Sequence, residues 1–249
     1  MNDQVSSEIA DGVQTIRFDR MDGENRLTSR MCESTSDALS FGESSSRVRA
    51  VLLAGGTGIF SAGLDAEELE SFAKSGTVGE SVLRLLKTMA SIDKPIIAAV
   101  DGLSFGLGTT MLFHCDYVVA SEWAIFAAPV VEIGLPPEGA VSIIAPRLMG
   151  HHRAFGMLVM GDQFDAQQAM YAGLVNKVVP ADAVEAAGAD AARILATKPP
   201  EAVRMARRLM RGGRREITRR IDLEAKSFSD LLRSPAARDA LEAYIEAHR

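Results

Sequence analysis

The strongest constraint on the fold of this chain is the alternation of short apolar runs with amphipathic stretches. Residues 48–54 and 95–100 are almost entirely apolar, and each run is followed by a glycine-containing turn. A strand that is buried on both faces has this composition, because neither face needs polar side chains. Residues 29–41 and 78–91 instead carry apolar side chains at helical spacing. Strands that alternate with helices predict an α/β fold with a largely parallel core.

The last third of the chain has a different character. Residues 13–18 and 117–120 are further expected strands and residues 109–113 begin a helix, but beyond Arg153 only residues 177–179 resemble a strand. The remainder is predicted to be helical, over residues 182–197, 201–211, 217–232 and 235–248. We therefore divide the chain into a core domain, residues 1–195, and a carboxy-terminal helical region, residues 196–249.

Charge and cysteine usage exclude several classes of protein. The 27 basic and 33 acidic residues give a net charge of −6, which argues against a nucleic-acid binder held by phosphate contacts. Cys32 and Cys115 are too few and too far apart for a disulfide framework or a metal cluster. No leader-like segment begins the sequence, and the apolar runs are far shorter than the roughly 20 residues that cross a bilayer. These features predict a soluble, cytoplasmic protein without metal or membrane contacts.

Two glycine-rich loops each follow an apolar run, with the sequences FSAGLD at residues 60–65 and DGLSFGLG at residues 101–108. Neither matches a nucleotide-binding motif. Small residues at a turn that leads into a helix let a ligand approach the backbone and leave N–H groups free. Two such turns side by side could direct two donors at one oxygen atom, as in an oxyanion hole. Glycine content alone favours two ordinary tight connections over an oxyanion hole.

Taken together, these loops closely resemble the two signature blocks of the enoyl-CoA hydratase/isomerase (crotonase) superfamily. The similarity extends through residues 94–108, Cys115 and Asp116, Gly134, Pro137 and residues 172–175, in the family's order and over essentially the whole chain. The resemblance implies a crotonase-type (ClpP-like) spiral of ββα units. It also implies a carboxy-terminal helical region that packs subunits into homotrimers, which often pair as hexamers.

The resemblance further implies an acyl-CoA thioester substrate, so that coenzyme A belongs to the substrate and no separate cofactor is needed. In this family the thioester oxygen lies between two backbone N–H groups, which the motifs assign here to Ala62 and Leu107. The neighbouring residues expected to bind the substrate are Gly63, Leu64, Asp65 and Gly106.

The side chains indicate which reaction of the family is possible. Family hydratases use two glutamates to place and split water, and this chain has Thr110 and Val130 at those two positions. A different carboxylate, Glu138, stands in the sequence PPEG at residues 136–139, where the chain resembles the delta-3,delta-2-enoyl-CoA isomerases. Moving a double bond from β,γ to α,β consumes no water, so one general base is sufficient. We therefore predict an enoyl-CoA isomerase with Glu138 as its base, mostly ionised at neutral pH.

Alternatives remain at this stage. Glu138 could simply interact with a helix dipole, and Glu132, in the expected extended segment 130–133, is a competing acid. A hydratase that uses Glu132 and Glu138, or a catalytically silent acyl-CoA-binding subunit, would also fit. His114 is expected to be a packed core residue, and Asp116 to fix the following turn. The arginines between residues 204 and 220 form either a solvated face or part of an anion site.

Overall fold

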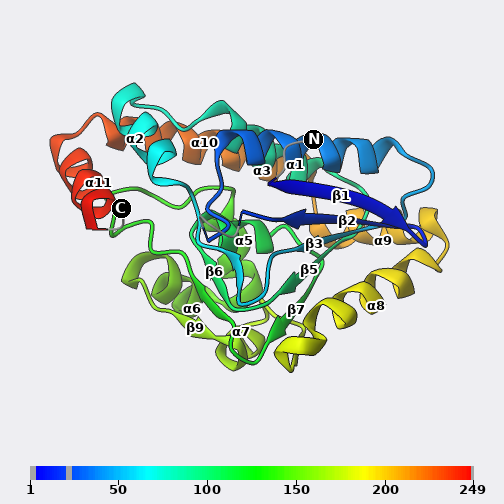
Figure 1. The fold of residues 1–249 in the computed structure, drawn as a ribbon. Helices are drawn as coiled ribbons and strands as arrows, with labels where there is room; N and C mark the ends of the chain where they lie inside the picture. Colours follow the sequence, from blue (N-terminus) through cyan, green and yellow to red (C-terminus); the bar gives the residue numbers. More distant parts are fainter. Residues whose placement is uncertain (1–3, 21–23, 248–249) are drawn as a thin grey trace.

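The computed structural model describes residues 4–20 and 24–247 and contains two β-sheets (Figure 1). The larger sheet has the strand order β1-β2-β3-β5-β7-β10. Its neighbouring strands are parallel except for the hairpin of β1 with β2. These strands are β1 (Val5–Ala10), β2 (Val13–Phe18), β3 (Ala50–Ala54), β5 (Ile96–Val100), β7 (Tyr117–Ser121) and β10 (Lys177–Val179).

The smaller sheet positions the two glycine-rich loops. Its order is β4-β6-β8-β9, formed by β4 (Ile59–Ser61), β6 (Leu103–Phe105), β8 (Ile125–Ala127) and β9 (Phe164–Asp165). β4 and β6 are parallel, with Ser61 opposite Ser104. Since parallel strands end at the same edge of a sheet, the segments that follow them, residues 62–65 and 106–108, begin side by side.

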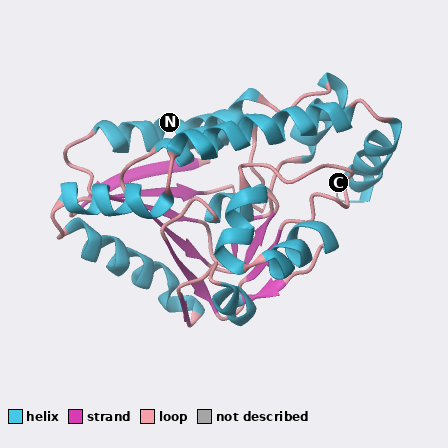
Figure 2. Ribbon diagram, turned by 180° about the vertical axis from the view of Figure 1, so that it is seen from behind, coloured by secondary structure: helices cyan, strands magenta, loops and turns pink. Residues whose placement is uncertain are grey.

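Helices cover both faces of the larger sheet. In Figures 1 and 2, α1, α3 and α10 lie over one face and α8 lies over the other. The helices are α1 (Ser29–Ser44), α2 (Ala66–Ser75), α3 (Glu80–Ser91), α4 (Leu107–Leu112), α5 (Val141–Met149), α6 (His151–Phe155), α7 (Ala166–Ala172), α8 (Val184–Ala196), α9 (Pro200–Arg211), α10 (Arg214–Leu232) and α11 (Pro235–Ala247). A π-helical turn, Gly156–Met160, and a 3₁₀ turn, Ala181–Ala183, complete the chain.

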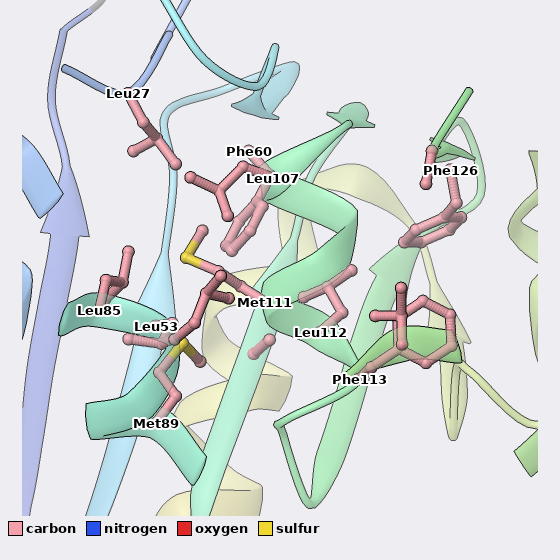
Figure 3. Packing of buried hydrophobic residues seen from close by; sticks show 14 of the residues in the cluster. Leu27, Leu53, Phe60, Leu85, Met89, Leu107, Met111, Leu112, Phe113 and Phe126 are labelled. Atoms are coloured by element: carbon pink, nitrogen blue, oxygen red, sulfur yellow. The ribbon is translucent and has the colours of Figure 1, made fainter. Parts of the chain in front are cut away.

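The apolar run of β3 is buried on both faces, as its composition predicts. Leu52 belongs to a cluster with Ile97 and with Val184 of α8. Leu53 faces the main core, where it packs with Leu85 and Met89 of α3 and with Met111 of α4 (Figure 3). Because both faces need apolar partners, the strand cannot alternate polar and apolar residues, which explains the pattern in the sequence.

Several expectations need correction. Residues 130–133 form turns rather than an extended strand, since the N–H of Glu132 donates to the carbonyl of Pro129 at 3.1 Å. The sequence did not predict β1, whose six residues VSSEIA are half polar, or β4, β6, β8 and β9, which have two or three residues each and no apolar run of their own. The expected end of the last helix at residue 248 lies outside the described residues. None of the described helices is long and apolar enough to span a membrane.

Candidate active site

A cavity of about 50 Å³ lies where the two glycine-rich loops meet. Five of the predicted site residues line it: Ala62, Gly63, Leu64, Gly106 and Leu107. Glu138 lines it as well, so the tertiary structure brings the predicted base to the predicted loops. The remaining wall is mainly apolar and consists of Leu69, Phe105, Pro129, Val130, Ile133, Phe228 and Tyr244.

The first loop does not offer the donor that the motif assigned. The N–H of Ala62 donates to the carbonyl of Glu24 at 3.1 Å, so it is already used within the fold. A short parallel bridge follows, in which Leu27 donates to the carbonyl of Gly63 and Asp65 donates to the carbonyl of Leu27. The intervening N–H of Leu64 has no acceptor among the described residues. The free donor of this loop is therefore Leu64, two residues after Ala62.

The second loop has a free donor at the expected residue. Leu107 is the first residue of α4, and the first N–H groups of a helix have no partner within it. The preceding N–H, of Gly106, donates to the carbonyl of Ala127 at 2.8 Å, whereas no described residue accepts from the Leu107 N–H. Gly63 lets the loops approach, because a Cβ there would lie 3.1 Å from the carbonyl oxygen of Phe105 and its φ is +91°.

Asp65 has a structural role rather than the predicted contact with substrate. Its carboxylate caps α2 by accepting from the N–H of Glu67 at 3.0 Å, and it pairs with Arg20 at 2.5 Å. Its side chain does not line the cavity. The sequence signal is the usual preference for aspartate at the residue before a helix.

Glu138 is only 7% exposed, and no described residue donates a hydrogen bond to its carboxylate. It lies three residues before the start of α5. Burial, with a smaller effect of the neighbouring negative charge of Glu224, raises the pKa of Glu138 to about 7. Glu138 is therefore about half ionised at pH 7, which is less than the mostly ionised state expected from the sequence. The loss of hydration outweighs any stabilisation by the helix terminus.

The other candidate residues either lie outside the cavity or carry no group that can transfer a proton. Glu132 is exposed and does not line the cavity. Val130 lines it but carries no titratable group, and Thr110 is buried with its methyl group near the backbone of Gly139. Asp116 is structural, but it does not fix the following turn as expected: its carboxylate accepts from the N–H of Ile96 at 2.8 Å and pairs with Arg207 at 2.6 Å. Glu138 is consequently the one carboxylate that reaches the cavity from the described residues.

Sequence reasoning missed the contribution of the carboxy-terminal helices. Phe228 of α10 and Tyr244 of α11 line the cavity, although the region from residue 196 onward was expected to serve in subunit packing. Helical periodicity shows only that a side chain is on an apolar face, and it does not identify what that face covers. Within the described part of the chain, no group of three or more His, Cys, Asp or Glu side chains forms a metal site.

Comparison with known proteins identifies the family of this chain. The sequence model of the enoyl-CoA hydratase/isomerase family matches residues 8–249. The mitochondrial enoyl-CoA hydratase of Pongo abelii is 28% identical, over 95% of this chain and 82% of that protein. The 1,2-epoxyphenylacetyl-CoA isomerase of Escherichia coli (strain K12) is 30% identical, over 80% and 78% of the two chains.

Comparison with solved structures gives the same family fold. The solved structure of Pseudomonas aeruginosa OdaA superimposes with a TM-score of 0.93 at 36% sequence identity and covers 100% of both chains. With its crotonase-type spiral, its two adjoining loops and a family match over nearly its full length, this chain belongs to the enoyl-CoA hydratase/isomerase family.

Proposed function

We propose that the protein is an enoyl-CoA isomerase that converts β,γ-unsaturated acyl-CoA thioesters into their α,β-unsaturated isomers. The carboxylate of Glu138 removes a proton from the α-carbon, and the electron pair delocalises over the thioester and the double bond as a dienolate. The protonated Glu138 then returns the proton to the γ-carbon, which leaves the double bond between the α- and β-carbons. The reaction neither consumes nor releases water, so it needs one acid–base group.

The negative charge that develops on the thioester oxygen needs donors that are already in place. We assign this role to the N–H groups of Leu64 and Leu107, which have no acceptor among the described residues; both residues line the same cavity as Glu138. Preorganised donors in a dry site stabilise such a charge without reorganisation at the moment of reaction. The apolar wall of Val130, Ile133 and Phe228 excludes water from the dienolate.

The observation that carries the proposal is the single carboxylate in the cavity. A hydratase mechanism would need a second group to hold water, but Glu132 is exposed and outside the cavity. Thr110 and Val130 occupy the two positions at which family hydratases carry glutamates. These features favour isomerisation over hydration, although several related proteins are named as hydratases.

We expect the protein to isomerise 3-enoyl-CoA without hydrating 2-enoyl-CoA. The two substrates are offered side by side, and the 2-enoyl-CoA and 3-hydroxyacyl-CoA products are separated by liquid chromatography. A 3-hydroxyacyl product would support the hydratase alternative. Binding of both thioesters without turnover would indicate a catalytically silent subunit.

The dependence of turnover on pH follows from the environment of Glu138. The base is active when it is ionised, and its pKa is raised to about 7. We therefore expect kcat to rise about tenfold for each pH unit below the pKa and to level off above it. An inflection near the ordinary glutamate value, about 4.3, would contradict the raised pKa of Glu138. The measurement is a kcat–pH profile between about pH 3 and pH 9.

We also infer that the protein forms a homotrimer or hexamer, as its family resemblance implies. In support, the described structure exposes the apolar side chains of Met205, Leu209 and Met210 on α9. The mass in solution, from light scattering, tests this inference.

A further inference from the structure

The two residues that follow Glu138 adopt a backbone conformation that needs support. Gly139 has φ +72° and Ala140 has φ +64°, both in the left-handed region. For an alanine this conformation costs roughly 1–2 kcal/mol. A rotation of the peptide unit between these two residues would relieve Ala140 and would also turn the backbone that carries Glu138. Something outside the turn must hold this peptide in place.

The carbonyl of the Gly139–Ala140 peptide is held by His114. The Nε2 atom of this histidine lies 2.7 Å from the carbonyl oxygen of Gly139, and since a carbonyl only accepts, Nε2 carries the proton. The unprotonated Nδ1 then faces the guanidinium of Arg211 at 3.5 Å. Burial, with the nearby charge of Arg211, lowers the pKa of His114 to about 4, so the ring stays neutral and keeps this tautomer.

The N–H of the same peptide is held by Glu224, which comes from α10. Its Oε2 accepts from the N–H of Ala140, and its Oε1 accepts from the N–H of Ser142 at 3.1 Å and from the Ser142 hydroxyl. Glu224 is 6% exposed, so these contacts are formed away from water. Burial raises the pKa of Glu224, and the three donors act in the opposite direction by favouring the ionised carboxylate. The same donors satisfy the beginning of α5.

We propose that His114 and Glu224 are positioning residues. They hydrogen-bond to the C=O and to the N–H of the Gly139–Ala140 peptide, and so fix the Glu138 carboxylate at the cavity. The C=O and N–H of a trans peptide point in opposite directions, so the two side chains prevent its rotation only when both are present. The two residues come from segments 110 residues apart in the chain. The inference rests on the proposed function of Glu138 as the base. A misplaced base loses rate rather than substrate affinity.

The experiment compares four variants in the isomerase assay and in amide hydrogen exchange. His114→Leu removes the donor to Gly139, whereas His114→Gln retains an N–H donor. Glu224→Gln removes the charge and leaves one accepting oxygen, which the two donors of Ser142 engage, so that the amide NH2 faces the N–H of Ala140. Glu216→Gln is the matched control, because Glu216 also joins α10 to α5, through Arg147 at 2.7 Å, but on the surface and away from Glu138.

We expect kcat to fall by about tenfold to a hundredfold in His114→Leu and Glu224→Gln, with KM within about threefold of wild type. His114→Gln should restore most of kcat, and Glu216→Gln should leave it unchanged. Exchange at the Ala140 amide should accelerate by about tenfold in Glu224→Gln and not in Glu216→Gln. Melting curves identify any variant that fails to fold. If Glu224→Gln does not fold, the comparison of His114→Gln with His114→Leu tests the positioning role.

Equal turnover in His114→Leu and His114→Gln, or a loss in KM alone, would overturn the positioning role. Unchanged exchange at Ala140 in Glu224→Gln would show that Glu224 does not hold the Gly139–Ala140 peptide. This result would not depend on whether the protein is an isomerase, because exchange needs no substrate. Absence of isomerisation in the wild-type protein would instead refute the proposed function. The two failures are therefore distinguishable.

Discussion

Replacing Glu138 by glutamine should lower isomerase turnover by about two to four orders of magnitude, the span expected for loss of a general base. Glutamine preserves the size of the side chain but cannot accept the α-proton. No other described carboxylate lines the cavity, so no nearby group can take over. Steady-state kinetics with 3-enoyl-CoA measure the loss. Affinity for the CoA ester, measured by calorimetry, should change little, because Glu138 is expected to contact the α-proton rather than the coenzyme A moiety.

The matched control for this variant is Glu132→Gln. Glu132 lies six residues earlier but is exposed and outside the cavity, so its turnover should remain close to wild type. If Glu132→Gln lost more activity than Glu138→Gln, the assignment of the base would be wrong. If neither variant lost activity, the isomerase mechanism would have to be abandoned.

Leu107→Pro should lower turnover by about a hundredfold to a thousandfold, because one oxyanion donor contributes roughly 3–4 kcal/mol to catalysis in other enzymes. Proline lacks the N–H group, and the first residue of a helix is the place where it is tolerated, since that N–H has no helical partner. Leu107 is the first residue of α4, so the substitution removes the donor with little cost to the helix. Single-turnover kinetics with 3-enoyl-CoA measure the effect.

Leu107→Ala separates the donor from the side chain. The leucine side chain is 1% exposed, and both substitutions remove it, so both lose a comparable amount of packing energy. Only the proline variant also loses the N–H. If the two variants, each shown to be folded, had the same turnover, the Leu107 N–H would not hold the thioester oxygen.

Much of the fold follows from local features of the sequence. The apolar runs identify β3 and β5 of the larger sheet, and helical spacing identifies α1 and α3, because burial on two faces or on one leaves a distinct pattern. The strands of the smaller sheet cannot be identified from local sequence patterns. β4 and β6 are three residues long each, and their existence depends on pairing with one another rather than on their own composition.

The candidate site likewise has features that the sequence locates and features that only the tertiary structure shows. The glycine-rich motifs located the loops, and the sequence around residue 138 located the carboxylate, because these features depend on local backbone needs. The donor was misplaced at Ala62, since only the tertiary structure shows that the carbonyl of Glu24 already accepts from that N–H. The roles of Phe228 and Tyr244 were likewise hidden, because a helical pattern does not identify the partner of its apolar face.

The sequence by itself therefore determined the family fold, the two loops and the candidate acid–base residue. The tertiary structure decided the protonation of Glu138 and the support of its turn. A pKa depends on burial and on charges that approach through space, and here the relevant charge is that of Glu224, 86 positions further along the chain. The turn after Glu138 is held by His114 and Glu224 for the same reason. Hydrogen bonds between distant segments have no periodicity in the sequence, and they exist only once the chain has folded.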